Sequence, residues 1–151
     1  MRLATIPARL LAGAALAVTI AVPLALAQGD VLTARKDGFK MLAANMEAIQ
    51  KVVQERQPVA AAVAPARAIA EHAPKIKTLF PPGSDAGQTR ALPAIWSDRA
   101  GFDRVADAFV TQANALVAAA EGGNASTLGS ALQATGQACG MCHRPYRAPA
   151  R

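Results

Sequence analysis

Residues 30–56 read DVLTARKDGFKMLAANMEAIQKVVQER, and this stretch decides the fold. Its apolar side chains, together with one arginine, recur at alternating steps of three and four residues. The members of this seam are Leu32, Arg35, Phe39, Leu42, Met46, Ile49 and Val53. Such a heptad seam is typical of a helix that packs in a bundle. We expect the helix to begin at Asp30 as its N-cap and to end near Arg56, just before Pro58.

The remainder of the chain predicts three more helices. They cover roughly residues 60–79, 97–121 and 124–144, and residues 80–93 form a loop rich in proline and glycine. Pro65 fits in the first turn of its helix, whereas Pro74 is expected to bend or end that helix. Gly122 and Gly123 stop the next helix, and Asn124 caps the last one. The predicted fold is all-α, an up-down-up-down antiparallel four-helix bundle.

Composition supports a single helical domain and excludes several classes of function. The chain has 151 residues, of which 52% are hydrophobic but only 4% aromatic, so alanine-rich helix packing is favoured over a β-sandwich. The formal net charge of +6 is scattered along the chain and forms no basic stripe with interleaved aromatics. Nucleic-acid binding is therefore not expected. No catalytic constellation is visible in the sequence, so we do not expect an enzyme.

The N-terminal segment, residues 1–27, has the pattern of a Sec-type secretory signal peptide. Arg2 and Arg9 precede an apolar run, and Ala25 and Ala27 form a small-residue cleavage signal before Gln28. A retained membrane anchor is the alternative. No later stretch approaches the ~20 apolar residues of a membrane span. We expect a periplasmic protein, free of the membrane after cleavage, whose domain comprises residues 28–151.

The chemistry is concentrated in Cys139-Gly140-Met141-Cys142-His143, which has the C-x-x-C-H spacing of c-type haem attachment. Two cysteines three residues apart share a helix face, so both thiols can join one edge of a porphyrin. The histidine that follows can then reach the iron as its proximal ligand. The same stripe continues upstream on the last predicted helix, which places the haem inside the bundle.

Three other uses of the two cysteines are possible. They could form a disulfide in an oxidising compartment. A thioredoxin-like redox pair belongs beside a βαβ unit, for which the sequence gives no signal. A zinc site needs a fourth ligand, and the other histidine, His72, is far away in sequence.

The position of the motif on the last helix resembles the class II cytochromes c, specifically the cytochrome c prime family. The resemblance extends from about residue 31 to residue 147. It rests on Arg35 with Phe39, on Leu79-Phe80-Pro81-Pro82-Gly83-Ser84, on Leu92-Pro93-Ala94-Ile95-Trp96, and on Ala138-Cys139-Gly140-Met141-Cys142-His143-Arg144-Pro145-Tyr146-Arg147. It implies one covalent haem c per chain, binding of NO and CO, a redox partner protein and a homodimer formed through the first two helices.

The resemblance also places Phe39 over the open side of the iron. Because phenylalanine has no lone pair to donate, we expect a five-coordinate, high-spin haem with a vacant apolar face. Met41 lies about 200° from Phe39 around the helix, and Met46 lies roughly 10 Å further along the axis, so we expect neither methionine to be well placed to ligate the iron. We expect NO binding, hindered CO binding and poor O₂ binding. The alternative is a low-spin class II electron carrier with a sixth protein ligand. His72 is a weak candidate for that ligand.

Three further side chains complete the expected site. Arg35 on an apolar seam is costly unless its charge is paired, and a haem propionate would pair with it. The alternative for Arg35 is a stem that snorkels to solvent. The resemblance places Arg147 near the proximal imidazole. Trp96 is expected to pack beneath the long loop.

Overall fold

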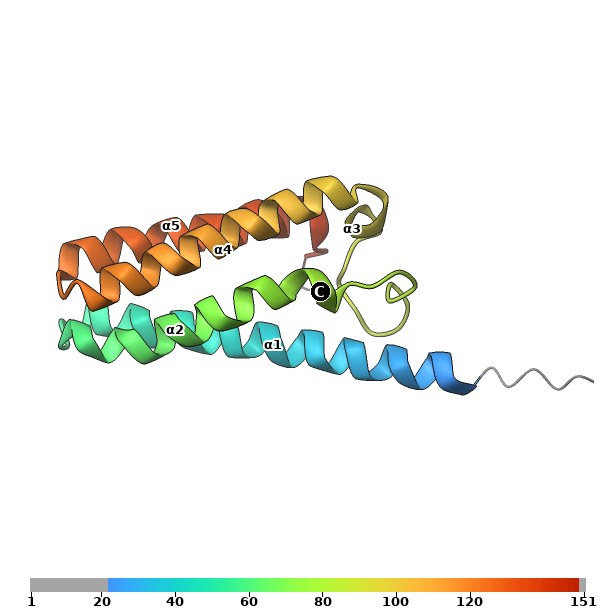
Figure 1. The fold of residues 1–151 in the computed structure, drawn as a ribbon, viewed down its shortest axis with the longest axis horizontal. Coiled ribbons are helices and arrows are strands. Elements are labelled where there is room, and N and C mark those ends of the chain that lie inside the picture. Colours follow the sequence, from blue (N-terminus) through green and yellow to red (C-terminus); the bar gives the residue numbers. More distant parts are fainter. Residues whose placement is uncertain (1–21, 150–151) are drawn as a thin grey trace, which may run out of the picture.

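The computed structural model describes residues 22–149, and four long helical segments pack side by side in it (Figure 1). The elements are α1 (Val22–Gln54), the 3₁₀ helix η1 (Val59–Ala62), α2 (Val63–His72), the 3₁₀ helix η2 (Ala73–Leu79), the short α3 (Ala94–Ser97), α4 (Arg99–Glu121) and α5 (Ala125–Tyr146). Within the described residues, extended pairing is limited to one isolated antiparallel bridge, between Ala91 and Arg147. The prediction of an all-α four-helix bundle is confirmed.

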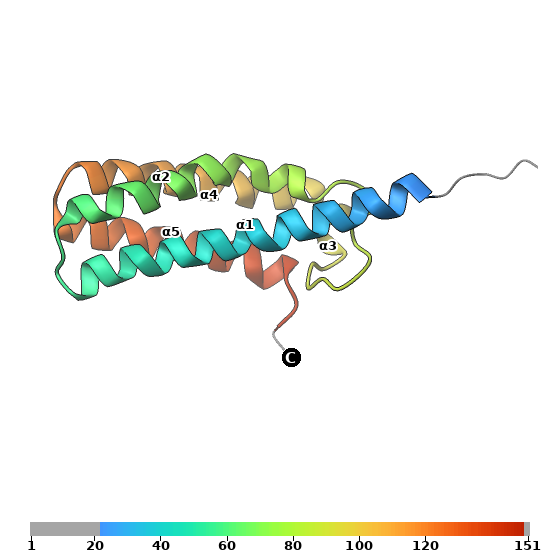
Figure 2. The ribbon, with the colours of Figure 1, turned by 90° about the horizontal axis from the view of Figure 1, so that it is seen from below.

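Each long helix packs against two neighbours. Both α1 and α4 contact α2 on one side and α5 on the other. Figures 1 and 2 show short turns at one end of the bundle, and the long loop with α3 at the other end. The N-terminal part of α1 projects beyond the bundle at the loop end, where the C-terminal residues also leave α5.

The seam of α1 faces the interior, as its spacing predicts. Leu42 and Ile49 are buried, and Phe39 and Met46 are half-buried against the core. The predicted start at Asp30 is wrong, because α1 begins at Val22 and runs through Asp30 without a break. The preceding segment is rich in alanine and leucine, which have high helix propensity and let the helix continue upstream.

The second helical segment changes its geometry near Pro74, as expected. The α-helical part ends at His72, and the chain continues as a 3₁₀ helix with Pro74 in its first turn. Proline lacks the N–H that an α-helical hydrogen bond requires. Pro65 lies in the first turn of α2, also as predicted.

The other helix boundaries agree with the sequence to within two residues. Asn124 caps α5 and accepts a hydrogen bond from the Thr127 N–H. Asp98 caps α4 and accepts a hydrogen bond from the Gly101 N–H. The last helix extends two residues past its predicted end, because α5 includes Pro145 and ends at Tyr146. The last helical turn tolerates this proline while the Arg147 N–H still donates to the His143 carbonyl (3.1 Å).

Most of the predicted signal peptide, residues 1–21, lies outside the described residues. In the described part of the chain, no helix has the length and apolar character needed to cross a membrane.

Candidate haem-binding site

A cavity of about 760 Å³ lies among α1, η2, the 80–93 loop, α4 and α5. Its apolar wall comes mainly from Leu42, Ile76, Phe102, Ala106 and Phe109. Cys139, Cys142 and His143 line the same cavity from α5. A mostly apolar cavity of this size, with a few polar groups at its edge, is typical of a site for a cofactor.

The two cysteines are half-buried, and both thiols are free. Burial raises the pKa of Cys142 to about 11 and also raises the pKa of Cys139. Redox-active dithiols instead have a lowered pKa, because the thiolate is the reactive form. Both thiols are shifted in the opposite direction, which is compatible with neutral thiols that form thioethers.

His72 is separated from this cavity. Its imidazole lies directly on Gly38 of α1, and its Nε2 atom is buried without a hydrogen-bond partner. His72 is not among the described residues that line the cavity, so the structure does not bring it to the cysteines. In the part of the chain described here, no group of three or more His, Cys, Asp or Glu side chains could hold a metal ion.

The imidazole of His143 is half-buried at the edge of the cavity. Burial lowers the pKa of His143, and the positive charges of Arg147 and Arg90 lower it further. The neutral imidazole is the form that coordinates a metal. One terminal nitrogen of Arg147 lies 3.2 Å from Nδ1 and 3.4 Å from Nε2 of His143, so the structure brings these two predicted site residues together.

Phe39 lines the cavity from α1, whereas the motif lines it from α5. Its ring packs on Phe80 with a centroid separation of 6.3 Å. Met46 also lines the cavity, whereas Met41 packs against the core without being part of the lining. Of these two methionines, the one on the heptad seam of α1 is therefore the one that borders the cavity.

Arg35 is 4% exposed, so the snorkelling alternative is wrong. Its Nε atom donates to the Leu79 carbonyl (2.9 Å), and one terminal nitrogen donates to Ser84 Oγ (2.7 Å) and to the Ser84 carbonyl (3.1 Å). The other terminal nitrogen has a long contact of 3.5 Å with Thr89 Oγ1. The guanidinium also lies 4.2 Å from the centroid of the Phe80 ring. No carboxylate within residues 31–149 pairs with Arg35, which lines the cavity, and its pairing with a haem propionate stays a prediction.

Trp96 anchors the long loop, as predicted. Its indole N–H donates to the Pro81 carbonyl (2.9 Å), and its ring makes an edge contact with Phe80. The loop is therefore attached both to α1 through Arg35 and to α3 through Trp96.

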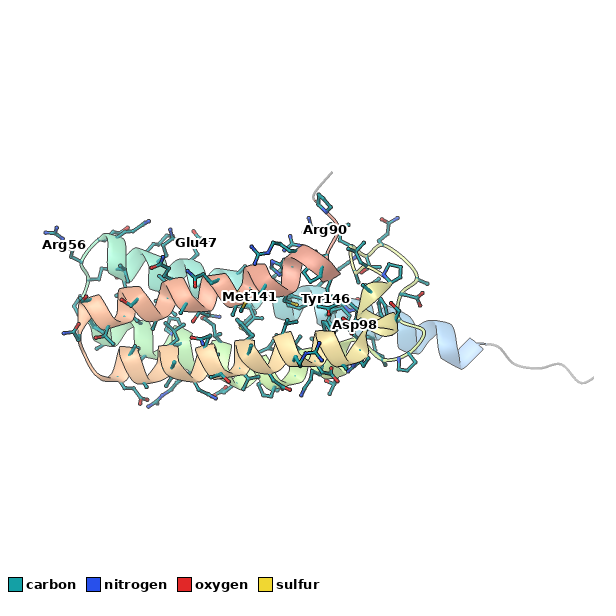
Figure 3. All side chains as sticks on the ribbon, turned by 90° about the horizontal axis from the view of Figure 1, so that it is seen from above. Glu47, Arg56, Arg90, Asp98, Met141 and Tyr146 are labelled. Atoms are coloured by element: carbon teal, nitrogen blue, oxygen red, sulfur yellow. The ribbon has the colours of Figure 1, made fainter. Side chains whose placement is uncertain are left out.

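A hydrogen bond that the sequence does not predict joins α5 to α4. The Tyr146 hydroxyl donates to one carboxylate oxygen of Asp98 (2.8 Å), and the other oxygen caps the Gly101 N–H (3.1 Å). Glycine is needed at position 101, because a Cβ atom there would meet both Asp98 and the Tyr146 hydroxyl. Asp98 three residues before Gly101 is a recognisable helix-cap pattern, but its partner Tyr146 could not be foreseen. Figure 3 shows Asp98 and Tyr146 together at the loop end of the bundle.

The residues present fit a haem. The cavity combines an apolar wall, two thiols one helical turn apart and an adjacent imidazole. Lys36, Lys40 and Arg90 add positive charges to its lining, which suits the two carboxylates of a porphyrin. The fold and the site together define a c-type haem protein built on a four-helix bundle.

Comparison with known proteins identifies the family. The family model described as Cytochrome C' matches residues 30–147, and the chain belongs to this family, whose cofactor is covalently attached haem c. The cytochrome c' of Rubrivivax gelatinosus is 34% identical over 127 residues, which cover 79% of this chain and 95% of the relative.

Two solved structures of the family are similar to this chain along most of its length. A cytochrome c' with ligand-controlled dimer dissociation has a TM-score of 0.77 at 29% identity, covering 81% of this chain and 97% of the other. The nitric oxide complex of a point mutant of cytochrome c prime from Alcaligenes xylosoxidans has a TM-score of 0.74 at 28% identity. It also covers 81% of this chain and 97% of the other. The recognition of the family from its motifs is confirmed.

Proposed function

We propose that this chain is a gas-binding cytochrome whose haem iron is five-coordinate and high-spin. In this proposal His143 binds the iron on one side, and the opposite side is a vacant apolar face beneath Phe39. The observation that supports it is the position of Phe39, which lines the cavity from α1 and offers no donor atom. The relative whose structure is described as a nitric oxide complex gives independent support.

The side chains on the vacant face would select among ligands. Bound haem supplies an iron that can take up a diatomic molecule on the face the protein leaves free. Phe39 provides no hydrogen bond, so a polar bound ligand such as O₂ gains nothing there. Its ring packs on Phe80 and must move aside for any ligand, which hinders weak binders most. NO and CO are the expected ligands, with CO entry hindered.

The haem can also change its oxidation state, so electron exchange with a redox partner protein is part of the proposal. We infer that residues 1–27 direct export to the periplasm and are then removed, leaving residues 28–151. We also infer a homodimer formed through α1 and α2, an assembly supported by the relative described as a dissociating dimer.

The deciding experiment compares absorption spectra and CO association rates of the haem-loaded wild type, Phe39→Met and Phe39→Ala. Phe39→Met places a thioether over the iron and should convert a high-spin ferric spectrum into a low-spin one. Phe39→Ala should stay high-spin and bind CO faster. A tenfold increase would correspond to a barrier lowered by about 1.4 kcal/mol.

Met46→Leu is the matched control, because Met46 also lines the cavity from α1. It should leave the wild-type spectrum unchanged. A low-spin wild type that becomes high-spin in Met46→Leu would instead support the alternative, a low-spin electron carrier with a sixth protein ligand.

A further inference from the structure

The segment 89–92 of the long loop is joined to the end of α5 by backbone hydrogen bonds. The Leu92 N–H donates to the Tyr146 carbonyl (3.0 Å), and the Ala148 N–H donates to the Arg90 carbonyl (2.8 Å). Between these two bonds, Ala91 and Arg147 form the isolated antiparallel bridge. The backbone of residue 90 is therefore fixed beside the chain that directly follows His143.

This pairing brings a second arginine to the proximal side of the site. Arg90 and Arg147 both line the cavity, and the charges of both act on the His143 imidazole. Neither arginine forms an ion pair with a carboxylate among residues 31–149. Arg90 lies at the same end of the bundle as Tyr146 and Asp98, opposite Arg56 (Figure 3).

The two arginines reach the edge of the cavity from different parts of the chain. Arg147 lies near His143 because it follows His143 by one turn in the sequence. Arg90 comes from a different part of the chain, and the pairing of residues 90–92 with residues 146–148 fixes where its backbone lies. A cation close to a redox centre favours the state with less positive charge, here the ferrous state.

We propose that Arg90 is a second proximal cation that raises the reduction potential of the haem and so favours the ferrous form. The inference rests on the attached haem and does not depend on whether the face beneath Phe39 is vacant. A unit charge several ångströms from a redox centre, acting through a water-like medium, shifts the ratio of its reduced to its oxidised form about two- to fourfold. For a one-electron couple that factor is about 20–35 mV.

The test is a redox titration of the haem-loaded protein, with Arg90→Gln and Arg90→Lys compared with the wild type. Arg90→Gln should lower the ferrous-to-ferric ratio at fixed potential about two- to fourfold, and Arg90→Lys should restore most of it. Arg144→Gln is the matched control, since Arg144 follows His143 directly but does not line the cavity. The control should move the ratio less than Arg90→Gln does.

Ionic strength separates a charge effect from a structural one. Because Arg90 is exposed, salt should screen its charge, and the difference between wild type and Arg90→Gln should shrink between 0.01 M and 1 M salt, where the Debye length falls from about 30 Å to about 3 Å. The proposal is overturned if Arg90→Gln matches Arg144→Gln, if Arg90→Lys behaves like Arg90→Gln, or if the difference persists undiminished at high salt. A low-spin wild-type spectrum would defeat the proposed vacant face and leave this result unaffected.

Discussion

Replacing Arg35 with leucine tests whether this buried cation stabilises the long loop. In the wild type, three hydrogen bonds of 2.7–3.1 Å run from its guanidinium to Leu79 and Ser84. Hydrogen bonds from a charged donor contribute about 1.5–3 kcal/mol each, whereas burying the charge without a carboxylate opposes part of that gain. We expect Arg35→Leu to lower the free energy of unfolding by about 2–4 kcal/mol.

The assay is guanidinium denaturation of the haem-loaded protein, followed by absorbance and circular dichroism. Lys51→Leu is the control, because it removes the same charge from an exposed residue of α1 that does not line the cavity. It should change the free energy of unfolding by no more than about 0.5 kcal/mol. If Arg35→Leu and Lys51→Leu agree to within that margin, the hydrogen bonds of Arg35 do not hold the loop and the reasoning is refuted.

Four other predictions follow from contacts elsewhere in the bundle. A Cβ atom at residue 38 would meet the His72 ring, so Gly38→Ala should raise the free energy of unfolding by roughly 1 kcal/mol, the helix propensity of alanine, only when His72→Ala removes that ring. A double-mutant cycle measured by denaturation tests this, and equal effects of Gly38→Ala in both backgrounds would contradict the contact. Burial lowers the pKa of His72, so the folded protein resists protonation of this imidazole and loses stability as pH falls below the ordinary histidine pKa of 6.5. His72→Gln should flatten that part of the pH–stability curve. Hydrogen bonds from Tyr146 and from a backbone N–H lower the pKa of Asp98, so the stability that the Asp98 carboxylate contributes is present above its ordinary pKa of 3.8 and is lost as pH falls further. Asp98→Asn should remove this loss of stability in acid, and an unchanged acid limb of the pH–stability curve would contradict the prediction. Asn124→Ala should cost about 0.5–2 kcal/mol through loss of the cap, measured by thermal unfolding, and a change near zero would show that the cap is not needed.

The helices could be predicted because their signals are local. The heptad seam of α1, the effect of Pro74 and the cap at Asn124 depend on residues close together in sequence, and all three are found. The start of α1 was missed because helix propensity upstream of Asp30 outweighs a single capping residue.

The family motif predicts the haem attachment residues, which line the cavity together, but the surroundings of the site depend on contacts distant in sequence. Arg35 was expected on the seam and is there, yet its bonds to Leu79 and Ser84 span 44 and 49 residues. The Tyr146–Asp98 bond spans 48 residues. Periodicity gives the face on which a side chain lies, but it does not give the partner that the fold brings to it.

The vacant face beneath Phe39 is tested most directly by the ferric absorption spectrum of the purified, haem-loaded wild type. The account predicts a high-spin spectrum without a methionine–iron charge-transfer band, and a ferrous form that takes up NO. A low-spin ferric spectrum with that band would contradict it, because a protein side chain would then occupy the position proposed for the gas.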